Sequence, residues 1–305
     1  MADPFITEFD PPVGRPETLL PGLRRLVAPN ASPMTFRGTN TYLLGEGPVA
    51  VIDPGPQDQT HLETILEAAG PAGISHILVT HSHVDHSPLS RPLAEATGAP
   101  VLAMGPSGAG RSAAMEALAQ AGELGGGEGI DRAFVPDRRL AHGEIVEGQG
   151  WRIEALATPG HLGNHMCFAW GERVFTGDHV MSWATTMVSP PDGDLTDFMA
   201  SLELLAARED DRLYLPGHGA ALEDPLAMVH YQIAHRRGRE AQILGELAAA
   251  PATPAQLARR IYTDVAPGLL PAAERNVLAH LIDLYGKEIV GCEGPLARNA
   301  VYYLR

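Results

Sequence analysis

Short apolar runs separated by turn residues dominate the first 220 positions of the chain. Their β-branched and aromatic content predicts strands, and glycine and proline mark where most of them end. Apolar residues at helical spacing predict three helices, over 60–69, 87–97 and 195–207. The mixture favours an α+β fold with two sheets. The predicted strands cover 40–44, 49–52, 74–80, 100–104, 145–146, 151–156, 166–170, 173–176 and 213–215.

The pattern changes after residue 223, where helical periodicity replaces the short strands. Asp224 before a proline predicts one helix start, and a capping box with proline at the first helical position predicts a second start at Thr253. A third periodic segment stops at Gly286, and the tail that follows predicts a two-stranded wing. We therefore predict a larger domain over residues 1–223 and a small winged-helix-like domain over residues 224–305.

Composition and charge narrow the class of protein. The 305 residues are 45% hydrophobic and 19% charged, which excludes a disordered chain. No apolar run is long enough to cross a membrane, and the first twelve residues lack the basic and apolar regions of a secretory signal. The two cysteines form no framework of spacings, so we expect free thiols, a cytoplasmic location and no membrane partner.

The net charge of −15 lies almost wholly outside the C-terminal part of the chain. Residues 251–305 hold six basic and five acidic side chains, so the excess of acid belongs to the first 250 residues. An acidic surface repels phosphate backbones, which makes a nucleic-acid partner less favoured without excluding a local basic groove. The basic stretch at Arg236, Arg237 and Arg239 predicts a solvated face or a contact between the domains, with an acidic substrate as the alternative.

Potential metal ligands are densest in the segment THSHVDH, residues 80–86. His81 and His83 are two residues apart at the predicted end of a strand, so both imidazoles should point the same way. Asp85 and His86 follow in the turn and can face a second point nearby. Neutral imidazoles and carboxylates are the ligands that suit zinc, manganese or iron. The segment therefore predicts a metal site.

Three later loops repeat this chemistry directly after a predicted strand. The segment TPGH ends at His161, the segment TGD ends at Asp178, and the segment LPGHG contains His218. A strand end on a rigid sheet can hold such ligands in place, so we expect these side chains to join those of residues 80–86.

The ordered set of His-x-His-x-Asp-His, Gly-His, Gly-Asp and Gly-His resembles the metallo-β-lactamase superfamily. The resemblance covers residues 40–220 and implies a four-layer αββα sandwich with metals at one edge between the sheets. It implies that one metal is held by His81, His83 and His161. It implies that a second is held by Asp85, His86 and His218, with Asp178 bridging the two.

The resemblance also suggests residues that support the ligands. Asp53, which follows a Val-Ile strand, matches an aspartate that supports ligand histidines in the family. His165 and His179 lie next to ligand segments, where each could touch substrate, support a ligand or be an ordinary structural histidine. The remaining histidines are predicted to be structural or exposed: His61, His76, His142, His230, His235 and His280.

A narrower resemblance is to the β-lactamase-like protein 2 group of the superfamily. It rests on residues 30–42, the Gly-His-x-x-x-His step at residues 160–165, the segment GDHV at 177–180 and the C-terminal module. One departure is the sequence Ser-Pro-Leu at 87–89, where many members have Ser/Thr-Gly-Gly. Only 40 positions separate Asp178 from His218, too few for the inserted domain of the nuclease branch.

These residues predict a dinuclear metal-dependent hydrolase. Two divalent ions roughly 3.5–4 Å apart can share a bridging hydroxide, formed because the ions lower the pKa of water towards about 7. Zinc is the preferred identity, with manganese or iron as the alternatives. Asp85 can hydrogen-bond the attacking hydroxide and later protonate the leaving group. The preferred substrate is a small-molecule or carrier-bound thioester, or another activated acyl compound.

Three alternatives stay open at this point. An endoribonuclease acting on single-stranded RNA is compatible with the narrower resemblance. An iron-dependent sulfur dioxygenase shares part of the ligand pattern, although His86 and His218 favour two metals over one. A non-catalytic reading makes the winged helix a module that binds nucleic acid or a protein partner, and its near-neutral charge favours protein contact.

Overall fold

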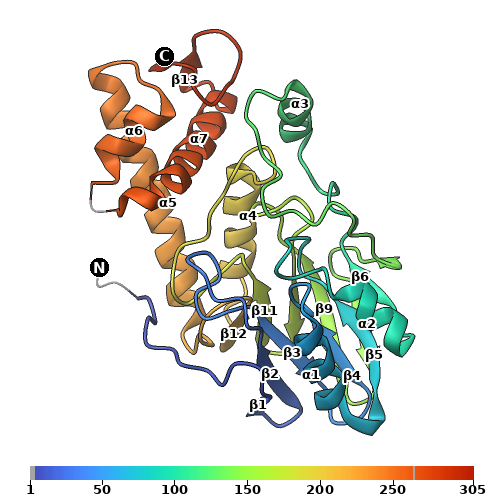
Figure 1. Ribbon diagram of the computed structural model, residues 1–305. Helices are drawn as coiled ribbons and strands as arrows, with labels where there is room; N and C mark the ends of the chain where they lie inside the picture. Colours follow the sequence, from blue (N-terminus) through green and yellow to red (C-terminus); the bar gives the residue numbers. More distant parts are fainter. Residues whose placement is uncertain (1–3, 264) are drawn as a thin grey trace.

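The computed structural model describes residues 4–263 and 265–305, which form two layers of sheet covered by helices and followed by a helical module. Figure 1 shows the two sheets face to face, with the C-terminal helices beyond α4. The layers run helix, sheet, sheet, helix, so the predicted α+β, αββα sandwich is confirmed. Within the described residues no helix is both long and apolar enough to span a membrane.

The first sheet contains the N-terminal strands in the order of the chain. Its first four strands pair antiparallel, while β5, β6 and β7 each pair parallel to the strand before. The strands of this sheet are β1 (Glu17–Leu20), β2 (Leu23–Val27), β3 (Asn40–Leu44), β4 (Val49–Ile52), β5 (Ile74–Leu78), β6 (Val101–Ala103) and β7 (Arg138–Arg139).

The second sheet packs against the first through an apolar core. Its order is β12-β11-β10-β9-β8, with a parallel pair only between β11 and β12. Side chains alternate across each strand, so Tyr42 and Leu44 face this core while Leu43 faces outward. The strands are β8 (Ile145–Gly148), β9 (Trp151–Ala157), β10 (Met166–Trp170), β11 (Arg173–Gly177) and β12 (Leu213–Pro216).

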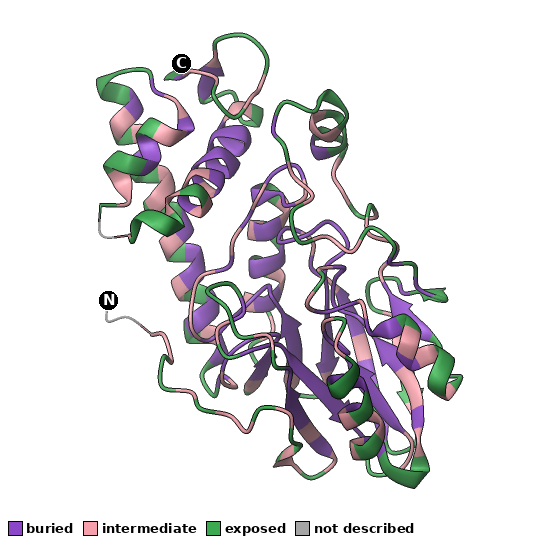
Figure 2. Ribbon diagram, in the orientation of Figure 1, coloured by how far each residue is buried: buried purple, intermediate pink, exposed green. Residues whose placement is uncertain are grey.

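Helices cover the outer face of each sheet. The helices α1 (Gln59–Ala69) and α2 (Ser90–Thr97) bury Leu62, Ile65 and Leu93 against the first sheet. The helix α4 (Leu195–Ala206) and the first half of α5 (Pro225–Ala249) cover the second sheet. Figure 2 shows the strands buried, whereas α1 and α2 keep exposed outer faces.

The C-terminal module has its own core and shares one helix with the sandwich. It contains α6 (Pro254–Ile261), α7 (Leu270–Gly286) and the hairpin of β13 (Val290–Cys292) and β14 (Tyr302–Leu304). The predicted capping box at Thr253, helix stop at Gly286 and two-stranded wing are confirmed. Val229 of α5 belongs to the core under the second sheet, and Leu247 to the core of the module. The predicted boundary at residue 223 stays a prediction.

The structure differs from the sequence analysis in several elements. The strand predicted over 74–80 ends at Leu78, and the helix predicted from residue 87 begins at Ser90. The strands β1 and β2 were not predicted, because their mixed polar and apolar residues lack a strict alternation. The helix α3 (Ala113–Ala121), capped by Ser112, follows a glycine-rich connection.

A buried histidine lies where the module meets the sandwich. His280 of α7 is 1% exposed, and neither ring nitrogen has a hydrogen-bond partner among the described residues. Burial, together with the like charges of Arg236 and His235, lowers the pKa of His280 to about 3. A histidine with this pKa stays neutral in the folded chain at pH 5, although it would be protonated in the unfolded chain.

Acidification should therefore destabilise the protein partly through His280. Above the unfolded pKa of about 6.5 the ring is neutral in both states, so protonation does not favour unfolding. As the pH falls from about 6.5 towards about 3, only the unfolded chain takes up the proton, and the free energy of unfolding decreases. Between pH 7.5 and pH 5 the free energy of unfolding of the wild type should fall by about 2 kcal/mol more than that of His280→Leu. Urea unfolding at both pH values measures this difference, and His230→Leu on the exposed side of α5 is the control. If His280→Leu kept the pH dependence of the wild type, His280 would take up its proton while folded.

Candidate metal centre

Seven side chains converge at one edge of the sandwich, between the ends of the two sheets. The loop after β5 brings four of them, and the loops after β9, β11 and β12 bring one each. They form two groups whose ligand atoms lie within 4.8 Å of one another in each group. The first group is His81, His83, His161 and Asp178, and the second is Asp85, His86 and His218.

The loop after β5 is held in place by backbone hydrogen bonds rather than by the strand. Since β5 ends at Leu78, His81 and His83 lie beyond it, yet their rings still converge. The backbone nitrogens of His86 and Ser87 both donate to the carbonyl oxygen of His83, at 3.0 Å each. This turn brings His86 back towards the ring of His81, at 4.2 Å between ring centroids.

A glycine allows the last loop to approach Asp178. A Cβ atom on Gly217 would lie 2.5 Å from Asp178 Oδ1 and 2.7 Å from His86 Cε1. Any larger residue would therefore push His218 away from the other ligands. This close approach explains why a glycine precedes His218.

In the first group one ring nitrogen of each of three imidazoles faces the others. His83 Nδ1 lies 2.9 Å from His81 Nε2 and 3.1 Å from His161 Nε2. The Nδ1 atom of His161 donates to the carbonyl oxygen of Met187 at 2.8 Å, which leaves Nε2 without a proton in a neutral ring. Burial lowers the pKa of all three histidines, to about 3 for His83. Nitrogens of neutral imidazole rings this close to one another suit a shared cation.

The second group combines two imidazoles and a carboxylate. Asp85 Oδ2 lies 3.1 Å from His218 Nε2 and 3.4 Å from His86 Nε2. The opposite nitrogens donate outward, His86 Nδ1 to Asp53 Oδ2 at 2.9 Å and His218 Nδ1 to the carbonyl oxygen of Gly38 at 3.2 Å. Both Nε2 atoms are thus aimed at the same point.

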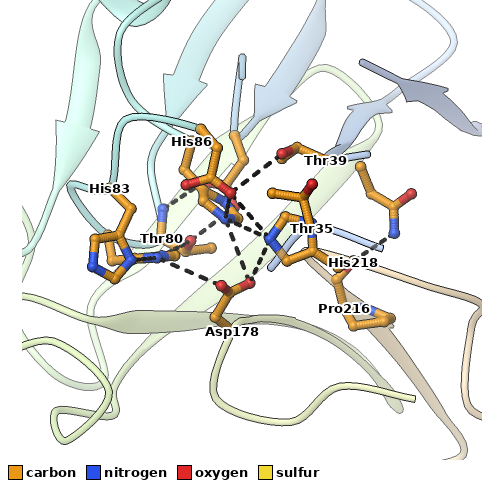
Figure 3. A network of polar contacts seen from close by, with 12 residues as sticks. Thr35, Thr39, Thr80, His83, His86, Asp178, Pro216 and His218 are labelled. Atoms are coloured by element: carbon orange, nitrogen blue, oxygen red, sulfur yellow. Dashed lines mark hydrogen bonds and ion pairs between the residues drawn. The ribbon is translucent and has the colours of Figure 1, made fainter. Parts of the chain in front are cut away.

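Asp178 lies between the two groups (Figure 3). Its Oδ1 is 3.4 Å from both His86 Nε2 and His218 Nε2, and its Oδ2 is 3.7 Å from His161 Nε2 and 4.0 Å from His81 Nε2. Oδ1 is buried and has no hydrogen-bond partner among the described residues. A buried carboxylate oxygen of this kind fits a cation that it can contact from either side.

The pKa shifts of Asp178 and His218 also indicate a place for a cation. Burial alone would raise the pKa of Asp178, but His218 and His86 outweigh it and hold that pKa well below its usual range. Burial opposes a proton on His218, yet Asp178 and Asp85 raise its pKa to about 9. The carboxylates therefore attract positive charge at the Nε2 side of His218, where a divalent cation would replace the proton.

Asp53 accepts hydrogen bonds that orient His86 and the residue before His81. Its Oδ1 accepts from the backbone nitrogen of Thr80, and its Oδ2 accepts from Thr80 Oγ1, each at 2.7 Å, besides accepting from His86. Thr80 Oγ1 also lies 2.9 Å from His81 Nδ1. Asp53 and Thr80 thereby orient one histidine of each group. The sequence analysis named Asp53 and missed Thr80, whose only signal was its position before the first histidine.

His165 and His179 are buried behind the ligands. The His165 ring lies 5.1 Å from that of His81, and its Nδ1 is 2.9 Å from Thr158 Oγ1. His179 packs on Phe198 at 4.5 Å, and neither of its nitrogens has a partner among the described residues. Both side chains are 0% exposed, so neither is placed to touch a substrate.

The loop of residues 186–188 connects the centre to the C-terminal helices. Thr186 Oγ1 donates to the backbone carbonyl of Asp178 at 2.7 Å, and Met187 accepts from His161 as described above. On the other side, Asn276 Oδ1 of α7 accepts from the backbone nitrogen of Val188 at 3.1 Å and from Arg236 Nη1 at 3.0 Å. Sequence reasoning could not identify this loop, because its backbone atoms make most of the contacts.

Arg236 and Arg237 of the basic stretch have different environments. Arg236 is 3% exposed, and its guanidinium also donates to the carbonyl oxygen of Thr186. Arg237 is exposed and pairs with Glu203 of α4 at 3.0 Å. Of the alternatives for this stretch, contact between the helical module and the sandwich applies to Arg236.

Comparison with known families defines the class of protein. Residues 34–218 match the model of the Metallo-beta-lactamase superfamily, and residues 253–293 match that of the Beta-lactamase associated winged helix domain. The chain therefore belongs to the metallo-beta-lactamase superfamily and is a hydrolase of that superfamily.

Two relatives illustrate the similarity, and the first belongs to the group of the narrower resemblance. The chain is 33% identical over 274 residues to a beta-lactamase-like protein 2 homolog of Drosophila melanogaster, covering 85% of this chain and 86% of the fly protein. It is 30% identical over 236 residues to an atrochrysone carboxyl ACP thioesterase of Aspergillus fumigatus, covering 75% of this chain and 65% of that enzyme.

Solved structures extend the likeness over nearly the whole chain. A metallo-beta-lactamase family protein of Thermus thermophilus superposes with a TM-score of 0.76 at 28% identity, covering 94% of this chain and all of that one. A beta-lactamase domain protein of Burkholderia ambifaria superposes with a TM-score of 0.80 at 21% identity, covering 98% and 96%. The second likeness shows the fold alone.

Replacing Asp53 by asparagine should weaken metal binding without removing a ligand. The amide nitrogen cannot accept a hydrogen bond, so Thr80 or His86 would lose its partner. We expect metal affinity to fall about 10- to 100-fold, the usual effect of losing such a support. Competition with a chromophoric chelator measures this affinity.

The matched control is Asp58→Asn at the N-cap of α1, where Asp58 accepts from the backbone nitrogen of His61. Asparagine caps a helix as well as aspartate does, so this variant should bind metal like the wild type. Equal affinities for the Asp53→Asn and Asp58→Asn proteins would contradict a supporting role for Asp53.

Proposed function

We propose that the protein is a dinuclear metal-dependent hydrolase that cleaves a thioester or another activated acyl compound. The observation that carries the proposal is the position of Asp178, with one oxygen towards each of two groups of ligand atoms. A mononuclear site would need only one of these groups. The second group also argues against the iron-dependent dioxygenase alternative.

The ligand set fits two divalent ions, with zinc as the proposed identity. His81, His83 and His161 would hold one ion, and Asp85, His86 and His218 would hold the other, with Asp178 shared. When bound, the two ions supply hydroxide at neutral pH and polarise the carbonyl group of the substrate. The mixed imidazole and carboxylate ligands suit zinc and also admit manganese or iron.

Asp85 is the side chain that we assign to proton transfer. Its side chain is 20% exposed, compared with 10% for Asp178, so it is the more open of the two carboxylates. Thr39 Oγ1 lies 3.5 Å from Asp85 Oδ2. Asp85 would take the proton from the attacking water and return it to the departing sulfur. In the reaction a carbon–oxygen bond forms, the carbon–sulfur bond breaks, and the products are a carboxylate and a thiol.

Two observations support an acyl substrate over RNA. Relatives that share most of this chain are named as thioesterases of acyl carrier protein, in Aspergillus fumigatus and Passalora fulva. The net charge of −15 opposes a polyanionic substrate. Both cysteines are free, and we retain a reducing cytoplasm as the proposed location.

A substrate panel on the metal-loaded protein tests the function. The panel contains S-acyl glutathione, acyl-CoA, acyl carrier protein thioesters, nitrocefin, a phosphodiester and single-stranded RNA. We expect turnover of thioesters, with release of a free thiol. Turnover of RNA alone would overturn the acyl assignment, and uptake of dioxygen with a persulfide would overturn the hydrolase.

The Asp178→Asn variant tests the shared position directly. Asparagine keeps the volume but removes the negative charge that offsets two cations. One ion site should therefore be weakened more than the other, and the metal content should fall from two ions per chain towards one. We expect turnover to fall at least about 100-fold, because a ligand and its charge are both lost. Metal content and turnover are measured together on this variant.

The control for Asp178→Asn is Asp224→Asn, at the exposed N-cap of α5. That substitution should change neither quantity, because asparagine is an equivalent cap. An Asp178→Asn protein with two ions and near-native turnover would refute the shared position.

A further inference from the structure

A cavity of about 270 Å³ opens beside the metal centre and extends to the C-terminal module. His161 and Asp178 form the end of the cavity nearest the ligands. The module contributes Leu269 from the 3-10 turn before α7, and Ala272 from its first turn. Residues that are far apart in the sequence, on either side of the shared helix α5, thus line one space.

The walls of this cavity are apolar. Met181, Trp183 and Met187 line one side from the segment after Asp178, and Tyr262 and Val265 line the other. Among the described residues that line it there is no lysine or arginine, and Asp178 is the single carboxylate. Walls that present no lysine or arginine do not suit the length of a phosphate backbone, whereas apolar walls suit a hydrocarbon group.

Contacts outside the cavity fix both walls. The Trp183 ring stacks on Phe36, with centroids 4.9 Å apart. Asn276, which also lines the cavity, binds the backbone of Val188 and the buried Arg236, as described above. The walls are therefore held at a defined separation before any ligand enters, which lowers the entropy cost of binding.

Apolar side chains also mark the mouth of the cavity. Met34 is 52% exposed and Leu269 is 44% exposed, and both belong to the lining. A water-exposed methionine and leucine at the mouth of an apolar space are typical of a binding site for an apolar group.

We propose that this cavity is the acyl subsite of the enzyme and that the C-terminal module selects the acyl group. An apolar acyl group of moderate size occupies the space between Trp183 and α7, with its carbonyl carbon at the end that His161 and Asp178 form. The volume is close to the lower limit of about 300 Å³ that ligand pockets show, so the group is smaller than a typical drug-sized ligand. The thiol-bearing carrier stays outside. This inference rests on the proposed thioesterase function.

The Ala272→Leu variant tests the subsite by filling it. The substrates are acetyl, hexanoyl and decanoyl thioesters of N-acetylcysteamine, a thiol without phosphate groups. We expect kcat/KM for the decanoyl ester to fall about tenfold or more, while that for the acetyl ester stays within about twofold, since only the longer group reaches Ala272. The half-exposed Leu269 gives a second variant, Leu269→Asp, which should show the same selective loss because its charge lies beside the hydrocarbon chain.

The matched control is Ala241→Leu on the exposed side of α5, which adds the same carbons to the same module away from the cavity. This control variant should leave kcat/KM unchanged for the acetyl, hexanoyl and decanoyl esters. If both cavity variants treated the three esters as the control does, the acyl subsite would be refuted while the thioesterase function would stand.

Binding separates failure of the subsite from failure of the proposed function. If the wild type hydrolysed none of the esters, the function would fall, and calorimetric titration with the amide analogue of the decanoyl ester, in which nitrogen replaces sulfur, would test the cavity alone. Binding to the wild type and to Ala241→Leu, but at least about tenfold weaker binding to Ala272→Leu, would support the cavity as an apolar site. Absence of binding to the wild type, or equal binding to all three proteins, would overturn it.

Discussion

The constraint on which the structure depends is the crowding of five imidazoles and two carboxylates in one buried space. Ring nitrogens of the first group lie within hydrogen-bond distance of one another, and Asp178 has a buried oxygen without a partner among the described residues. Positive charge at its centre would stabilise such a cluster. The outward hydrogen bonds of the rings, to Asp53, Gly38 and Met187, keep the inward nitrogens free to bind that charge.

The sandwich provides the rigidity that this crowding requires. The loops after four strands bring the seven side chains together, and the glycine at 217 lets two of these loops meet without a steric clash. The helix α5 then ties the module to the sandwich through both of their cores. Through Arg236 and Asn276 the module also holds the loop whose carbonyl orients His161. The C-terminal helices are therefore part of the framework of the site.

The sequence predicted the features that depend on local chemistry. The side chains that converge between His81 and His218, the hairpin of β10 and β11, and the capping box at Thr253 have motifs that short segments define. Features that depend on tertiary contact were missed. The mixed residues of β1 and β2 become strands only because β3 offers a partner. A contact between the domains was one alternative for Arg236, but its partners, Asn276 of α7 and the carbonyl oxygen of Thr186, could not be named from the sequence. No local pattern encodes a cavity whose walls come from segments before and after α5 in the sequence.

The central claim is that the cluster holds two ions that share Asp178. The most direct test is the metal content of the full-length protein, measured by elemental analysis after equilibrium titration of the demetallated chain with Zn²⁺. The account predicts saturation at two ions per chain, with both retained against a buffer containing a weak chelator. Saturation at one ion, with no further uptake at higher Zn²⁺, would contradict it.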